Sequence, residues 1–90
     1  MSQVVSDPAE IRRFQAALRQ FNSEISNSTS RIRAQLRSLG SAWRDQEYAR
    51  FSQELEGVIQ SFERYLQSAD GYIRHLDAKA APLEEYLRRR

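Results

Sequence analysis

Apolar residues in the first half of the chain recur at alternating steps of three and four residues. This spacing is that of a heptad seam on one face of an α-helix, and it predicts a helix over residues 7–39. Two residues indicate where this helix begins, because Asp7 can cap its N-terminus and Pro8 suits the first helical position. The apolar seam residues are Ile11, Phe14, Leu18, Phe21, Ile25 and Ile32.

Two further positions of this seam, Ser28 and Gln35, are polar. Polar residues at core positions cost stability but select register and partner, so we expect that role for both. The surrounding segment 22–30 is rich in Ser, Thr and Asn, which compete for backbone hydrogen bonds, and a break there would give three helices in total. We favour one continuous helix, because Ile25 and Ile32 stay in phase across a segment without Gly or Pro.

The second half repeats the pattern with larger side chains and a broader face. A stripe with the same three–four spacing runs from Tyr48 to Leu76, and a second row at seven-residue spacing lies beside it. These rows predict a helix over residues 44–80. Gly40 is typical of a helix end and places the bend at residues 40–43, while Pro82 indicates a stop or kink before a short segment, 82–90.

Two such helices joined by a short bend form an antiparallel hairpin, so the fold class is all-α and residues 1–90 form one domain. The two predicted helices also carry complementary charge, since residues 7–39 hold more Arg than acids and residues 44–80 hold more acids than bases. We assign the three–four stripes of both helices to the hairpin core. The core residues of the second helix are then Phe51, Leu55, Phe62, Tyr65, Tyr72 and Leu76. A lone hairpin would leave the extra row exposed, so we expect two hairpins to form a four-helix bundle through Ile59, Leu66 and Ile73.

Composition argues against several classes of function. The 14 basic and 12 acidic residues are interspersed, whereas a nucleic-acid surface is one-sided. The chain has no Cys and only His75, too few ligands for an ordinary zinc site, and it shows no nucleophile–base pair or phosphate loop. We therefore expect no catalytic residues, no metal, no cofactor and no enzyme activity. No apolar run approaches a membrane span and no signal-peptide core is present, so stable membrane insertion and a cleavable signal peptide are not expected.

The stretch LGSAWRDQEYARF (39–51), between two long helices, resembles the WXG (ESAT-like) family associated with type VII secretion. In that family a Trp-X-Gly turn joins the helices, and members form homodimers or heterodimers with similar hairpin proteins. The resemblance implies a bacterial protein made in the cytoplasm that is exported, or that serves as a co-secreted partner or effector adaptor. It also implies a secretion ATPase or an effector as further partners.

The bend residues Gly40, Trp43 and Asp45 depart from the family motif in one respect: Asp45 stands where the motif has Gly. Asp45 can cap the second helix, with Ser41 as a competing cap. The family's export signal, Tyr followed four residues later by an acid, is missing, so export would depend on a partner. Trp43 either closes the end of the bundle or forms part of a docking surface. The alternative function is a cytoplasmic structural or regulatory coiled-coil module without an export role.

Overall fold

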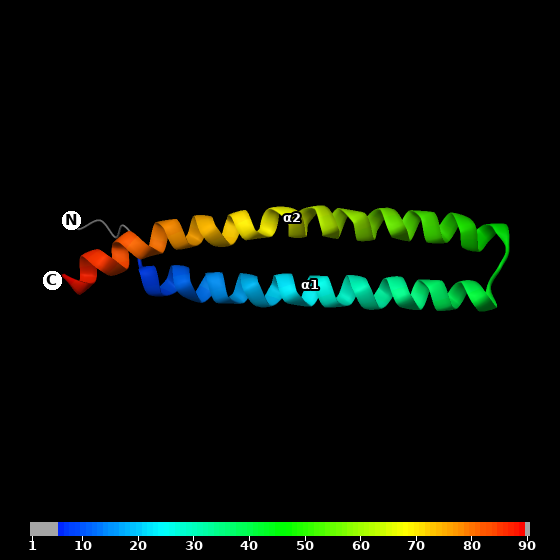
Figure 1. The fold of residues 1–90 in the computed structure, drawn as a ribbon, viewed down its shortest axis with the longest axis horizontal. Coiled ribbons are helices and arrows are strands. Elements are labelled where there is room, and N and C mark those ends of the chain that lie inside the picture. Colours follow the sequence, from blue (N-terminus) through cyan, green and yellow to red (C-terminus); the bar gives the residue numbers. More distant parts are fainter. Residues whose placement is uncertain (1–5, 90) are drawn as a thin grey trace.

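The computed structural model describes residues 6–89, which form an antiparallel hairpin of two long helices (Figure 1). Helix α1 spans Pro8–Ala42 and helix α2 spans Gln46–Arg88. The molecule measures 67 × 21 × 19 Å, with the bend at one end and the start of α1 and the end of α2 at the other (Figure 1). The predicted all-α helical hairpin is therefore confirmed.

Helix α1 begins where Asp7 caps it, with the Asp7 carboxylate accepting a hydrogen bond from the Ala9 N–H at 2.9 Å. The helix continues without a break through residues 22–30, where the Thr29 hydroxyl donates to the Ser26 carbonyl at 3.0 Å. It also continues past Gly40, whose φ is not positive. Gly40 is thus a helical residue, and the predicted bend at 40–43 begins three residues and ends two residues too early.

The bend consists of Trp43, Arg44 and Asp45. The Trp43 N–H donates to the Leu39 carbonyl at 2.9 Å and ends α1. The Asp45 carboxylate then accepts the Glu47 and Tyr48 N–H groups at 3.0 and 3.1 Å and caps α2. Three residues are enough to reverse the chain because Trp43 and Asp45, at the two ends of the bend, form hydrogen bonds with backbone groups of α1 and α2 that would otherwise be unpaired.

Helix α2 does not stop at Pro82 but continues through it to Arg88. The last turns of α2 bend toward the start of α1 (Figure 1). A proline inside a helix removes one backbone donor and favours a kink. The turns beyond Pro82 are nevertheless helical, and Glu84 in these turns accepts hydrogen bonds from Arg12 of α1. Position 90 of the predicted C-terminal segment lies outside the described residues.

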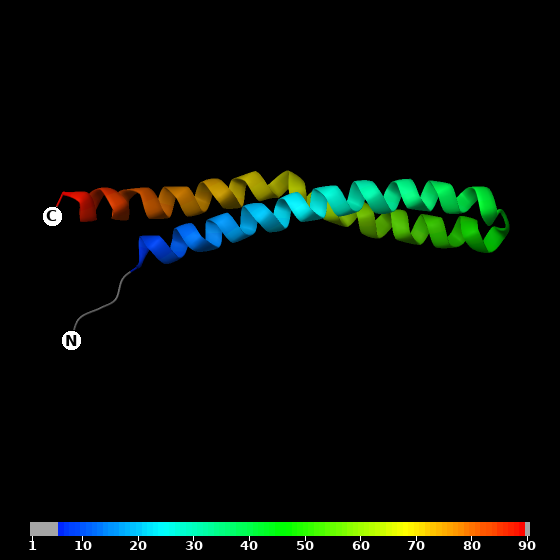
Figure 2. The same cartoon turned by 90° about the horizontal axis from the view of Figure 1, so that it is seen from below.

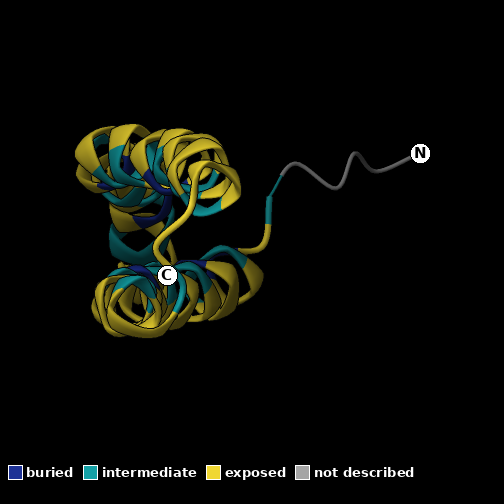
Figure 3. Cartoon of the chain, turned by 90° about the vertical axis from the view of Figure 1, so that its right-hand side faces the viewer, coloured by how far each residue is buried: buried dark blue, intermediate teal, exposed yellow. Residues whose placement is uncertain are grey.

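The two helices lie side by side (Figure 1) and cross near their middles in the perpendicular view (Figure 2). Hydrogen bonds join them both near the termini and near the bend. Viewed along the rod, the buried and half-buried positions lie mainly between the helices, and the outer sides of both helices are exposed (Figure 3). Within residues 6–89 the fully buried hydrophobic side chains are Ile59, Ala69 and Ala80. The interior of a single hairpin is therefore thin for a chain of this size. Neither α1 nor α2 has a stretch long and apolar enough to cross a membrane.

Candidate functional site

The row of α2 that faces α1 is the row Ile59, Leu66 and Ile73. Ile59 is only 2 % exposed, and Leu66 and Ile73 are half-buried inside the hairpin. A side chain enclosed by its own hairpin has no free surface to offer a second chain. The assignment of Ile59 to a dimer interface is therefore wrong, and this row belongs to the hairpin core.

The matching inward row of α1 is largely polar, which is why the heptad pattern missed it. Gln15 is 4 % exposed and Thr29 is 8 % exposed, and both occupy one seven-residue row with Pro8, Asn22 and Leu36. Gln15 donates from its amide to the Ile73 carbonyl at 3.1 Å. Tyr65 donates its hydroxyl to the Asn22 side-chain oxygen at 2.7 Å. These bonds satisfy polar groups that would otherwise be costly to bury.

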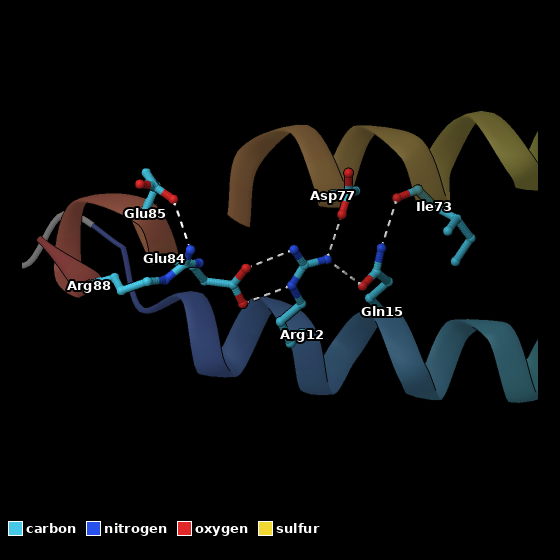
Figure 4. Close-up of polar contacts among 7 residues, drawn as sticks. All are labelled: Arg12, Gln15, Ile73, Asp77, Glu84, Glu85 and Arg88. Carbon is cyan, nitrogen blue, oxygen red and sulfur yellow. Dashed lines mark hydrogen bonds and ion pairs between the residues drawn. The ribbon is translucent and has the colours of Figure 1, made fainter. Parts of the chain in front are cut away.

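One flank of the hairpin is closed by arginine clamps, and we call this flank the polar face. Near the termini, Arg12 donates to both carboxylate oxygens of Glu84 at 2.8 and 2.9 Å and to Asp77 at 2.7 Å (Figure 4). Arg12 also donates to the Gln15 side-chain oxygen at 2.9 Å, which orients the Gln15 amide toward Ile73. The clamp therefore joins both sides of the Pro82 kink to α1.

A second clamp lies nearer the bend, where Arg33 donates to Glu56 at 2.7 Å and to Glu63 at 2.8 Å. The hydrogen bond from Arg33 lowers the pKa of Glu63; burial opposes this shift, and the charge of Arg33 adds a smaller effect in the lowering direction. The Arg12 hydrogen bond lowers the pKa of Glu84 in the same way. Both carboxylates are thus held ionised, and the clamps fix the register of α2 against α1.

The opposite flank carries large hydrophobic side chains in the open, and we call it the apolar face. Phe14 is 58 % exposed, Val58 is 50 % exposed and Tyr72 is 51 % exposed. The apolar face consists of Phe14, Phe21, Ile32, Leu39, Phe51, Val58, Phe62 and Tyr72. Such a contiguous exposed patch is typical of an interaction surface rather than of a monomer's solvated side.

Most residues of the apolar face were predicted to form the hairpin core. The structure instead exposes Phe14, Phe21, Ile32, Phe51, Phe62 and Tyr72, and only half-buries Ile11, Leu18, Ile25, Leu55, Tyr65 and Leu76. Both helices are rotated about their long axes relative to the predicted packing. The Arg12 and Arg33 clamps and the Gln15 hydrogen bond hold them so that the row with Gln15 and Thr29 on α1 faces the row with Ile59 and Ile73 on α2. The large aromatic rows are left on the outside.

Aromatic rings also gather at the bend. The Trp43 ring is half-buried and lies edge-on to the Tyr48 ring at 5.6 Å and tilted against the Phe51 ring at 5.9 Å. Tyr48 in turn donates its hydroxyl to the Leu36 carbonyl at 2.7 Å. Trp43, Glu47, Arg50, Phe51 and Glu54 line a shallow hollow there. The end of the apolar face is thus closed by Trp43.

Comparison with known proteins gives one match. The family model WXG100, described as proteins of 100 residues with WXG, matches residues 3–86. The chain belongs to the WXG100 family. No curated protein and no solved structure matched it. WXG100 proteins are small helical proteins of the type VII secretion class, and they typically dimerise with hairpin partners.

In this WXG100 protein the motif turn is the Trp43–Asp45 bend itself. Asp45, at the place of the motif Gly, supplies the α2 cap that a glycine lacks. His75 is exposed, and no group of three or more His, Cys, Asp or Glu within residues 6–89 is placed to hold a metal ion. The feature of the described chain that most clearly needs a partner is the apolar face.

Proposed function

We propose that this protein acts in type VII secretion as one half of a four-helix bundle, with its apolar face covered by a second hairpin. The role is non-enzymatic: the bundle is the secreted unit, or the adaptor that carries a secreted partner. Residues 1–90 contain no Tyr-X-X-X-acid sequence, and we propose that a partner supplies this export signal.

The exposure of the apolar face carries this proposal. The hairpin buries three hydrophobic residues fully but exposes eight large ones on a single flank. Full burial of a large apolar side chain contributes roughly 1.5–3 kcal/mol, and side chains that are about half exposed in the hairpin forgo roughly half of that. On the polar face, Arg12 and Arg33 already pair with carboxylates of the same hairpin, which supports a second hairpin on the apolar side.

A charge on the apolar face tests the proposal. Phe62 is 44 % exposed in the hairpin and lies near the middle of the face, so Phe62→Asp leaves the hairpin interior intact while placing a carboxylate in the bundle core. Gln60→Asp is the matched control, because Gln60 is exposed on the same helix away from the apolar face.

In the producing cell, we expect Phe62→Asp to lose the native hairpin complex and the appearance of the protein in the medium, while Gln60→Asp keeps both. Native gel electrophoresis and immunodetection of cells and medium measure these quantities. Equal complex formation by both variants would contradict the proposed interface. A complex without export would instead support the coiled-coil module without an export role.

A further inference from the structure

Each helix carries a fully apolar row beside the row that faces the other helix, and we call these two rows the flanking rows. On α1 the facing row includes Gln15 and Thr29, and the flanking row, on the side of the apolar face, is Ile11, Leu18, Ile25, Ile32 and Leu39. On α2 the flanking row is Tyr48, Leu55, Phe62, Ala69, Leu76 and Leu83. Most of these side chains are half-buried at the edge of the contact between the helices.

A small turn of both helices would bring the flanking rows together. Neighbouring rows at seven-residue spacing lie about 50° apart around a helix, so a turn of about 50° by each helix is enough. The two helices turn in opposite senses, because each moves its apolar side inward. The exposed large residues Phe14, Phe21, Phe51, Val58 and Tyr72 then lie at the edge of the contact instead of facing water.

The sequence is therefore compatible with two packings of one hairpin. We call the packing of the structure open, because it displays the apolar face, and the turned packing closed. The closed packing replaces the polar centre of α1, with Gln15, Asn22 and Thr29, by an apolar one, and it buries more apolar surface within a single chain. Two packings of the same sequence that differ little in free energy interconvert.

The polar contacts between the helices oppose this turn. Arg12 and Arg33 reach their carboxylates from rows at the edge of the contact, on the polar face (Figure 4). The turn moves these rows outward and apart, so it weakens both clamps. It also carries Gln15 away from the centre and breaks the hydrogen bond to the Ile73 carbonyl at 3.1 Å. The clamps thus stabilise the open packing in particular.

We infer that the hairpin is a conformational switch, in which the arginine clamps hold the apolar face open and their release lets the chain cover that face itself. The inference rests on the proposed function, because it gives the regulation of the face that the second hairpin covers. A second hairpin binds only the open packing, so partner and clamps shift the equilibrium in the same direction.

A pair of cysteines on the polar face reports the open packing. Arg19 is seven residues after Arg12 and Asp70 is seven residues before Asp77, so Arg19 and Asp70 lie at the same level in the two clamp rows. Both are exposed, and the chain has no native cysteine. The variant Arg19→Cys/Asp70→Cys is the open pair.

A second pair on the apolar face reports the closed packing. Ser28 is seven residues after Phe21 and Val58 is seven residues before Tyr65, and the Phe21 and Tyr65 ring centroids lie 6.1 Å apart across the hairpin. Ser28 and Val58 are therefore at the same level, and both are exposed in the open packing. The variant Ser28→Cys/Val58→Cys is the closed pair.

Disulfide formation separates the two packings because it needs Cα atoms within about 7 Å of each other. For helix axes about 9 Å apart, Cα atoms of rows at the edge of the contact are about 6–7 Å apart, and those one row further out are about 10 Å apart. The open pair therefore crosslinks in the open packing, and the closed pair crosslinks in the closed packing. The rates are measured on the isolated full chain at nanomolar concentration, where it is monomeric.

Removal of the clamps should reverse the crosslinking. Arg12→Gln/Arg33→Gln removes four charged contacts between the helices, so the rate of the closed pair relative to the open pair should rise at least about tenfold. Arg13→Gln/Arg64→Gln is the matched control, because Arg13 and Arg64 bond within their own helices, and it should leave the relative rate unchanged.

An unchanged relative rate in a helical Arg12→Gln/Arg33→Gln chain overturns the inference. Where this variant loses its helical circular dichroism, sodium chloride at about 1 M, which screens the clamps of the otherwise unaltered chain, decides in its place. A rise in the relative rate with salt then supports the switch, and a constant rate overturns it.

The result is separable from the proposed function, because no partner takes part in the crosslinking. An overturned switch together with loss of the native complex in Phe62→Asp leaves the proposed function standing. A reversed crosslinking pattern with a native complex that Phe62→Asp does not affect supports the two packings and contradicts the proposed interface.

Discussion

The contact between Gly40 and Tyr48 allows a sharp prediction about stability. Gly40 lies inside α1, and a Cβ atom added to it would stand 2.8 Å from the Tyr48 hydroxyl oxygen and 3.1–3.2 Å from the ring. The hydroxyl cannot move away freely, because it donates to the Leu36 carbonyl at 2.7 Å. Gly40→Ala should therefore displace the Tyr48 ring and break this hydrogen bond.

Two opposing effects set the magnitude. Alanine is favoured over glycine in a helix interior by about 1 kcal/mol. Against this stand the lost hydrogen bond, worth about 0.5–1.5 kcal/mol, and the overpacking of the ring, which costs about 1–3 kcal/mol. We expect Gly40→Ala to lower the free energy of unfolding by about 1–2 kcal/mol. Gly57→Ala is the matched control, because a Cβ there meets nothing within 4 Å, and it should raise stability by about 1 kcal/mol.

Thermal and urea unfolding followed by circular dichroism, at one fixed protein concentration, measure both changes. In a Tyr48→Phe background the hydroxyl is gone, so Gly40→Ala should cost clearly less than in wild type. Equal stabilisation by Gly40→Ala and Gly57→Ala would refute the close approach, and with it the role of Gly40 in seating the bend aromatics.

Three further predictions concern the clamps and the helix ends. Lowering the pH from 6 to 3 should reduce the melting temperature, because folding lowers the pKa values of Glu63 and Glu84. The resulting stabilisation is present above the pKa of the unfolded carboxylates and is lost as the pH falls through their folded pKa values. The variant Arg33→Gln should show a weaker dependence of melting temperature on pH. Asp45→Gly, which creates the Trp-X-Gly motif, should cost a few tenths of a kcal/mol in urea unfolding, and Asp45→Ala about 1 kcal/mol, since only the wild-type side chain accepts two N–H groups. Pro82→Ala restores a backbone donor within α2 and should raise the free energy of unfolding, measured in urea, by up to about 3 kcal/mol. An unchanged free energy of unfolding would mean that the Arg12–Glu84 contact imposes the kink.

The helices and their antiparallel arrangement could be predicted because the relevant signals are local. Asp7, the three–four spacing and the absence of Pro or Gly between residues 9 and 39 all act within a few residues. The bend was misplaced for an equally local reason. Glycine after a periodic run is typical of a helix end, but Gly40 lies inside α1, where its missing side chain makes room for Tyr48 on the other side of the bend.

Rotation of the two helices about their axes was not predictable from hydrophobicity alone. The three–four stripe of α1 was assumed to face α2, whereas the inward row contains Gln15, Asn22 and Thr29. A usable signal was nevertheless present in the charges. Glu56, Glu63, Asp70, Asp77 and Glu84 follow one another at seven-residue spacing, and Arg12 and Arg33 are 21 residues apart on α1. Pairing these rows would have turned the aromatic face outward.

The most direct test of the apolar face as an interface is its accessibility to solvent in the producing cell. The chain has no cysteine, so single cysteines at Val58 on the apolar face and at Gln60 away from it report on one position each. Both side chains are exposed in the isolated hairpin. With a membrane-permeant thiol reagent, we expect Val58→Cys to be modified at least about tenfold more slowly than Gln60→Cys, with the difference abolished by Phe62→Asp. Equal modification rates for the two cysteines would contradict the covered face.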